Sequence, residues 1–268
     1  MRKQLEYSVH TLIPYINWVY FDHAWGVSGK TGDEKKSLRE YAMLLVEKMN
    51  TNSRVQCVFR LCEANSEGDD IIVDGVRIPM LRQQQTTPSL CLADFIRPKF
   101  MGIADRIGLF ATTCHNLAQE PSVEGCAKCD DPYQKMLLQT LSDRLAEAAA
   151  EVLHLEVRKH YWGYAPDENL TIEDLHAERF QGIRPAVGYP SLPDTSINFL
   201  LSDLLDMKSI GIRLTESGMM VPHASVSGLM IAHPEARYFD IGKIGADQLS
   251  DYARRRAIPQ ELMRRFLK

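Results

Sequence analysis

Apolar side chains recur every three or four residues between positions 33 and 50, and charged residues fill the places between them. One face of a helical wheel collects four of these apolar residues: Leu38, Ala42, Leu45 and Met49. A stripe with this spacing is typical of an amphipathic helix that packs against a core. The pattern therefore predicts a helix over residues 33–50.

The same spacing continues over a longer stretch in the middle of the chain and predicts one long helix at about residues 132–161. Asp131 is a suitable N-cap. The proline after it is compatible with the first helical turn, because a backbone N–H there has no partner within the helix. Arg144, Glu147 and Glu151 share one stripe of this helix. A different stripe is apolar and comprises Met136 or Leu137, then Leu141, Leu145, Ala149, Val152 and Leu153.

Shorter apolar runs on both sides of the long helix predict strands. In one of them, apolar residues flank Asp74-Gly75, a strong signal for a hairpin turn. Strands are expected at 55–65, 70–80, 105–114, 211–221, 224–234 and 237–244. Short helices are expected from about Thr171, where Asp174 completes a capping box, and at 197–207, 246–256 and 259–268. Along the chain, strands are followed by the long helix, then by further strands and by the last helices, and no Pro/Gly/Ser-rich linker divides them. This order predicts one α+β domain over residues 1–268 with a mainly antiparallel sheet.

Composition and charge narrow the classes of protein. The chain has 268 residues, of which 45% are apolar and 25% charged, and its formal net charge is −4. Because there is no basic tract, nucleic-acid binding is not expected. No apolar run approaches a membrane span, and the first fifteen residues lack the apolar core of a signal peptide, so we expect neither membrane insertion nor secretion. Six dilute cysteines fit a reducing, cytoplasmic location.

Several widespread catalytic motifs are absent from the sequence. No G-x-G-x-x-G loop occurs between a strand and a helix, which disfavours a Rossmann nucleotide site. Neither H-E-x-x-H nor G-x-S-x-G occurs, which weakens protease and esterase interpretations. Cys126-Ala-Lys-Cys129 allows a redox or metal-binding role, with Cys114-His115 as possible further ligands. One CxxC pair supplies only half of a structural zinc site, so this interpretation rests on a weak signal.

The segment Gly182–Ser196, GIRPAVGYPSLPDTS, combines three prolines with an arginine and a tyrosine. Proline excludes a helix or a central strand here. The guanidinium of Arg184 matches a carboxylate, and Tyr189 with nearby acidic residues suits a cation. A carboxylate together with a cation describes an amino-acid sulfonium such as S-adenosylmethionine. Alternatively, Arg184 binds a carboxylate of the protein itself, and the residues alone do not decide between the two.

Several longer stretches resemble one known family, the activation domain of cobalamin-dependent methionine synthase. The resemblance spans almost the whole chain, and YWGYAPDENL followed by GIRPAVGYP is its most specific part. It also includes PYINW (14–18), LRQQ (81–84), CLADFI (91–96), DRLAEAAAEVLHLEVRKH (143–160), LTES (214–217), ASVSGL (224–229), HPEARYF (233–239) and GKIGADQLSDYARR (242–255).

The resemblance implies a fold and an activity. The fold is a single α+β domain with a twisted antiparallel sheet. The activity is repair: when the synthase's cob(I)alamin oxidises to cob(II)alamin, a flavodoxin supplies an electron and S-adenosylmethionine supplies a methyl group. The implied ligand-binding residues are Arg184, Ala186, Gly188, Tyr189, Tyr238, Phe239, Glu147 and Glu178, with Asn17 at the position of a family aspartate. No residue is expected to act as an acid or a base, because the leaving group is a neutral thioether.

The sequence departs from the family pattern at three places. Asn17 replaces an aspartate, Thr195 replaces a histidine, and His223 stands where the family has a glycine. We expect these changes to cluster around the ligand and to weaken its binding. The sequence also has no corrinoid-binding D-x-H-x-x-G segment. We therefore expect a stand-alone reactivation protein for a methionine synthase that lacks this domain, with cobalamin carried by that partner and a flavodoxin-like electron donor.

Two other functions remain open at this point. The protein could be a docking module for a corrinoid protein, with weak or lost S-adenosylmethionine binding. It could also be a CxxC redox or metal-binding protein on the same fold.

Overall fold

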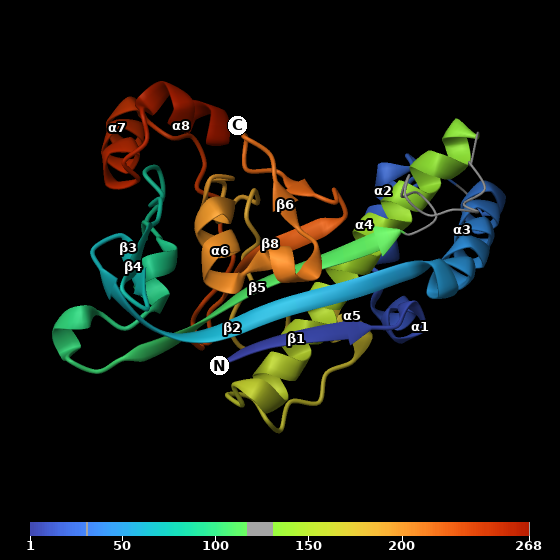
Figure 1. Ribbon diagram of the computed structural model, residues 1–268, viewed down its shortest axis with the longest axis horizontal. Helices are drawn as coiled ribbons and strands as arrows, with labels where there is room; N and C mark the ends of the chain where they lie inside the picture. Colours follow the sequence, from blue (N-terminus) through green and yellow to red (C-terminus); the bar gives the residue numbers. More distant parts are fainter. Residues whose placement is uncertain (31, 117–130, 268) are drawn as a thin grey trace.

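The computed structural model describes residues 1–30, 32–116 and 131–267 (Figure 1). Its strands are β1 Arg2–Tyr7, β2 Ser53–Glu67, β3 Asp70–Val73, β4 Val76–Pro79, β5 Asp105–Asn116, β6 Arg213–Leu214, β7 Met220–Val221 and β8 Ser225–Met230. Its helices are α1 Val9–Leu12, α2 Trp18–Ala24, α3 Asp33–Asn52, α4 Pro132–Glu156, α5 Ile172–His176, α6 Ile197–Leu205, α7 Ala246–Arg255 and α8 Gln260–Phe266. None of the helices in these residues is long and apolar enough to cross a membrane.

The main sheet is antiparallel and is built on β2. Its strand order is β4-β3-β2-β5-β8, and β1 pairs with the first half of β2. The predicted hairpin is confirmed, because β3 and β4 pair across Asp74 and Gly75, whose φ angles of 48° and 84° suit a tight turn. The predicted α+β fold with a mainly antiparallel sheet is therefore confirmed.

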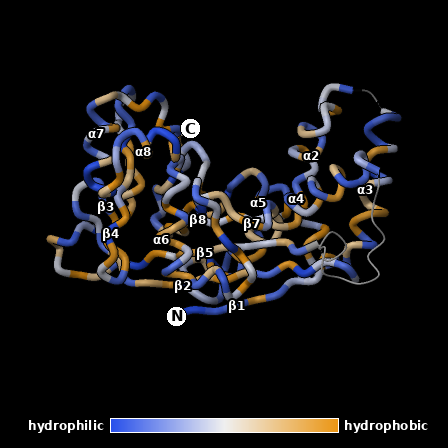
Figure 2. The backbone as a smooth tube through the Cα atoms, turned by 45° about the horizontal axis from the view of Figure 1, so that its top comes forward, coloured by the Kyte–Doolittle hydropathy of each residue, from blue (hydrophilic) through white to orange (hydrophobic). Residues whose placement is uncertain are grey.

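Both faces of the sheet are covered. Side chains alternate along β2, so that Phe59 joins the core beneath α4 while Val58 joins the core on the α6 side. The hydroxyl of Thr112 on β5 donates to the carbonyl of Ala146 on α4 at 2.9 Å, which fixes the long helix to the sheet. Figure 2 shows α2 and α3 at one end of the sheet and α7 and α8 at the other.

The long helix forms as predicted. The carboxylate of Asp131 accepts from the backbone N–H of Tyr133 at 2.9 Å and caps α4. The helix continues beyond Glu156 through a π-helical turn at Val157–Tyr161, which completes the expected span. The apolar stripe from Leu137 onward is buried in the core. The other stripe, which consists of Arg144, Glu147 and Glu151, is not part of this apolar core.

Residues 183–187 extend the sheet by an irregular edge next to β8. Ile183 exchanges two backbone hydrogen bonds with Ile231, both of 2.9 Å, and the carbonyl of Pro185 accepts from Leu229 at 3.0 Å. A proline is compatible with this place because an edge needs no N–H from it. We call residues 183–191 the Arg184 segment. Its first half is thus fixed to the sheet.

The predicted strand at 237–244 is wrong. This segment lies across the Arg184 segment without regular pairing, and its backbone N–H groups bind there instead. The N–H of Phe239 donates to the hydroxyl of Ser191 at 2.9 Å, and that of Ile241 donates to the carbonyl of Pro190 at 3.1 Å. The apolar side chains that suggested a strand pack into apolar clusters instead: Tyr238 against the core on the α6 side, and Ile241 with residues of α7 and α8.

Other differences concern short elements. The expected strand at 211–221 is two two-residue strands, β6 and β7, joined by a turn. Strand β1 was not predicted, because its sequence RKQLEY is mostly polar and exposed, and only Leu5 and Tyr7 pack against the core. The capping box at Thr171 and Asp174 is confirmed at the start of α5.

Gly228 on β8 allows the Arg184 segment to lie close to the sheet. A Cβ atom at Gly228 would lie 2.2 Å from the carbonyl oxygen of Pro185 and 2.9 Å from Ala186 Cα. We expect Gly228→Ala to lower the free energy of unfolding by about 1–3 kcal/mol because the segment must move away. Urea denaturation measures this change.

Gly29→Ala is the matched control, since no atom lies within 4 Å of the added carbon there. Its unfolding free energy is expected to stay within about 0.5 kcal/mol of the unmodified protein. Equal stability of the two variants would contradict the close approach at Gly228.

Candidate functional site

A cavity of about 720 Å³ lies where α2, α4 and α5 meet the Arg184 segment and residues 238–239. The second stripe of α4 lines it with Arg144, Glu147 and Glu151. All but Gly188 of the nine predicted site residues line it as well: Asn17, Glu147, Glu178, Arg184, Ala186, Tyr189, Tyr238 and Phe239. The structure thus brings together residues that are up to 222 positions apart in the sequence, counted from Asn17 to Phe239. Their contacts with a ligand stay a prediction.

Arg184 and Glu151 form a buried ion pair at the cavity wall. Arg184 Nη2 lies 2.8 Å from Glu151 Oε2, and the two side chains are 15% and 10% exposed. The backbone N–H of Arg184 donates to the hydroxyl of Tyr238 at 2.8 Å. Arg184 therefore binds a carboxylate of the protein itself, which is the second of the two interpretations from sequence.

This ion pair leaves two polar atoms without a partner. Arg184 Nε and Glu151 Oε1 are both buried and make no hydrogen bond. Buried polar groups are nearly always paired, so two unpaired atoms in one ion pair are an unusual feature of this cavity wall. Sequence reasoning missed Glu151 as a site residue, although its stripe on α4 was recognised.

Glu147 anchors the exposed end of the Arg184 segment. The hydroxyl of Tyr189 donates to Glu147 Oε1 at 2.8 Å, and Arg144 Nη2 lies 3.5 Å from the same oxygen. Burial and the Glu147 carboxylate raise the pKa of Tyr189, which keeps its hydroxyl protonated and able to donate. The tyrosine thus ties the segment to α4 at a second point.

Glu178 follows α5 in a left-handed conformation with φ of 56°. Glycine is the preferred residue at this position after a helix, so a carboxylate is placed here at some conformational cost. Burial raises the pKa of Glu178, Arg184 opposes that change and Glu151 adds to it. Its carboxylate is one of three that line the cavity.

Asn17 lines the cavity from the start of α2. Its side-chain oxygen accepts from the N–H of Val19 at 3.1 Å and caps this helix. The helix is held to α3 by Asp22, which is buried and binds Lys35 and Arg39, each at 2.9 Å. With the oxygen used as the cap, the amide nitrogen is the group that Asn17 can offer to a ligand.

The matches to known proteins agree with this geometry. Residues 8–257 match the family model described as the vitamin B12-dependent methionine synthase activation domain. The chain belongs to this activation-domain family. A crystal structure of the MetH reactivation domain bound to AdoHcy superimposes with a TM-score of 0.90 and is 39% identical. The match covers 100% of this chain and 89% of that one, and it confirms the family resemblance and the fold.

Two of the departures from the activation-domain pattern lie outside the cavity. Thr195 donates to the carbonyls of Ser217 and Phe266, both at 3.2 Å, and thereby contacts the end of α8. His223 Nδ1 lies 3.1 Å from Asp143 Oδ1 on α4. The expectation that all three changes cluster at the ligand is therefore wrong for these two residues, because their side chains bind other parts of the protein.

Gly188 is required by the backbone and does not line the cavity. Its φ is 88°, and its N–H donates to the carbonyl of Leu192 at 2.8 Å. Only glycine adopts such a turn readily. The turn points Tyr189 toward Glu147, so Gly188 acts on the site through its neighbour, and direct contact with a ligand stays a prediction.

The cysteine pair Cys126 and Cys129 lies outside the described residues. Within residues 1–30, 32–116 and 131–267, no group of three or more potential ligands is placed to hold a metal ion. Cys114 is buried, and that burial raises the pKa of its thiol to about 12. His115 Nε2 lies 2.9 Å from the carbonyl oxygen of Ile210.

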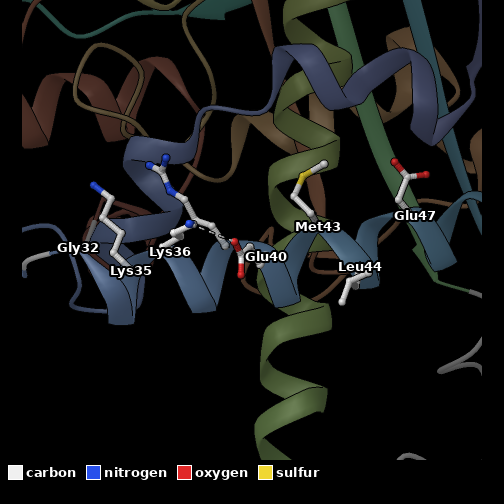
Figure 3. A pocket seen from close by; sticks show the side chains of 8 residues that line it. Gly32, Lys35, Lys36, Glu40, Met43, Leu44 and Glu47 are labelled. Carbon is white, nitrogen blue, oxygen red and sulfur yellow. Dashed lines mark ion pairs between the residues drawn. The ribbon is translucent and has the colours of Figure 1, made fainter.

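A second hollow lies along the outer surface of α3 (Figure 3). It is lined by the aliphatic parts of Lys35, Lys36 and Arg39 together with Met43 and Leu44. Lys35 and Arg39 already bind Asp22, and Lys36 pairs with Glu40 at 3.9 Å on the same helix. The three cations of this surface are thus paired with carboxylates of the protein itself.

Proposed function

We propose that this activation-family domain binds S-adenosylmethionine in the cavity beside α4 and presents its methyl group for the reductive reactivation of a cobalamin-dependent methionine synthase. The observation that carries the proposal is the cavity beside α4, which is lined by Arg184 together with the carboxylates of Glu147, Glu151 and Glu178. The MetH reactivation domain of the same fold is bound to AdoHcy, the demethylated form of this ligand.

The charges of the cavity match S-adenosylmethionine. Three carboxylates, those of Glu147, Glu151 and Glu178, line it with two guanidiniums, those of Arg144 and Arg184, so acidic groups exceed basic ones by one. S-adenosylmethionine carries a carboxylate, an ammonium and a sulfonium, which sum to one positive charge. S-adenosylhomocysteine lacks the sulfonium and is neutral overall. Charge complementarity therefore favours the methyl donor.

The chain's part in the reaction is binding and orientation. The methyl group leaves a sulfonium as a neutral thioether, so no residue needs to protonate or deprotonate the ligand. The partner's reduced cobalamin supplies the nucleophile. Arg184 and the carboxylates hold the methionine end of the donor, and this fixes the direction of the S–CH₃ bond. Tyr238 and Phe239 provide flat surfaces in the same cavity.

The proposal includes a partner and a location. The partner is a methionine synthase without an activation domain of its own, which carries the cobalamin, and the electron comes from a flavodoxin-like donor in the cytoplasm. Family membership supports the reaction. A reactivation assay with such a synthase tests whether it is a partner of this protein.

Arg184→Lys tests the binding site while keeping a positive charge beside Glu151. Lysine lacks the second edge of the guanidinium, so we expect S-adenosylmethionine affinity to fall by about ten- to a hundredfold. Isothermal titration calorimetry measures the change. Arg179→Lys is the control, because Arg179 is 70% exposed and binds only Asp174 among the contacts described. Unchanged affinity in Arg184→Lys would remove the proposed site.

The reactivation assay tests the function. An oxidised methionine synthase lacking its activation domain, mixed with this protein, S-adenosylmethionine and reduced flavodoxin, is expected to recover methyl transfer. Arg184→Lys is expected to need a higher S-adenosylmethionine concentration for the same rate. If the unmodified protein binds the ligand and the synthase stays inactive, the protein is a docking module without reactivation activity.

A further inference from the structure

Two buried polar residues lie behind the cavity and do not line it. His154 on α4 and Arg158 in the π-helical turn are both fully buried. Their partners Tyr164 and Glu168, on the loop that follows, do not line the cavity either. Burying a histidine and an arginine is costly unless each makes specific hydrogen bonds, so their contacts indicate what they do.

The contacts of His154 define its protonation state. Arg158 Nη1 lies 2.9 Å from His154 Nδ1, and because a guanidinium can only donate, Nδ1 is the acceptor and carries no proton. The ring proton is therefore on Nε2, which lies 3.3 Å from the hydroxyl oxygen of Tyr164 and donates to it. Burial, together with the positive charges of Arg158 and Arg184, lowers the pKa of His154 well below its usual range. His154 is thus a neutral ring with one donor and one acceptor, and both are in use.

The arginine side of this network holds Phe180. The Arg158 guanidinium lies 4.2 Å from the centre of the Phe180 ring, and the His154 ring meets the same ring edge-on at 5.0 Å. Glu168 fixes the guanidinium in this place, because its Oε2 accepts from Arg158 Nε at 2.9 Å. Phe180 is therefore held by two side chains, four residues before Arg184.

The tyrosine side of the network holds Gly182. A Cβ atom at Gly182 would lie 3.1 Å from the hydroxyl oxygen of Tyr164 and 2.4 Å from the carbonyl oxygen of Ile231. The backbone at Gly182, with φ of 82°, thus passes between Tyr164 and the edge of the sheet with no room for a side chain. The chain is confined here, two residues before Arg184.

We propose that His154 is a positioning residue for the ligand site. Its partners Arg158 and Tyr164 fix residues 180–182, and these residues determine where Arg184 enters the cavity wall. His154 itself touches no ligand, so a change in the network moves the Arg184 segment without removing a ligand contact. The effect on ligand binding rests on the proposed function, whereas the effect on the segment does not.

Tyr164→Phe tests this role, because it removes the hydroxyl and keeps the ring. The N–H groups of Ile183 and Val187 report on the segment, since both are hydrogen-bonded to the sheet edge. We expect their hydrogen exchange to become about three- to tenfold faster, because one hydrogen bond is lost, while exchange in β2 and β5 stays unchanged. Affinity for S-adenosylmethionine, measured by calorimetry, is expected to fall by a similar factor.

Tyr161→Phe is the matched control. Tyr161 lies in the π-helical turn, its ring packs 4.9 Å from that of Phe59, and none of the described residues forms a hydrogen bond with its hydroxyl. Exchange and affinity are expected to stay within about twofold of the unmodified protein. Unchanged exchange or unchanged affinity in Tyr164→Phe would overturn the positioning role.

His154→Asn separates the contact with Tyr164 from a general loss of packing. The asparagine oxygen can still accept from Arg158, but the side chain is too short to reach Tyr164. Tyr164→Phe is therefore expected to cause no further loss of affinity in the His154→Asn protein, because both changes remove the same contact. Additive losses would overturn the inference.

The ring of His154 gives a spectroscopic check. In ¹⁵N NMR spectra of the unmodified protein, we expect the proton on Nε2 and a bare Nδ1, even at about pH 5, where an ordinary histidine is charged. A proton on Nδ1 would overturn the inference. If His154→Asn does not fold, this spectrum and Tyr164→Phe decide.

The measurements also distinguish this inference from the proposed function. If the unmodified protein binds neither S-adenosylmethionine nor S-adenosylhomocysteine, the proposed function fails, and hydrogen exchange in Tyr164→Phe still decides whether the network positions the Arg184 segment. If the unmodified protein binds them and Tyr164→Phe binds them equally well, the proposed function stands and only the role of His154 is overturned.

Discussion

The ion pair between Arg184 and Glu151 is the interaction on which the site depends. Removing two charges from water is costly, and their attraction offsets that cost only when the geometry is good. Here each side chain uses one atom for the partner and keeps one buried atom unpaired. A pair that served stability alone would gain by satisfying these atoms. The incomplete pairing agrees with the proposed use of this cavity wall for binding a ligand.

The rest of the fold positions the two halves of this pair. Glu151 is carried by α4, which is fixed to the sheet by its apolar stripe and by the bond from Thr112 to Ala146. Arg184 lies on an edge next to β8, close to the sheet because Gly228 has no side chain. The sheet therefore sets the distance between a helix and a loop that are 33 residues apart in sequence.

Much of this arrangement could be predicted from the sequence. Periodicity located α3 and α4, and the Asp74-Gly75 hairpin followed from local turn chemistry. The family motifs in the sequence predicted nine site residues, and all of them but Gly188 line one cavity. Periodicity placed Glu147 and Glu151 on one stripe but did not say which carboxylate meets Arg184, because that depends on the rotation of α4 against β8. The segment 237–244 has a strand-like pattern, yet its backbone binds Ser191 and Pro190.

A crystal structure with S-adenosylmethionine at saturating concentration tests the central claim most directly. The account predicts the ligand in the cavity beside α4, with its carboxylate within hydrogen-bond distance of the Arg184 guanidinium. An empty cavity under these conditions would contradict the account. So would a ligand whose amino-acid end points away from Arg184.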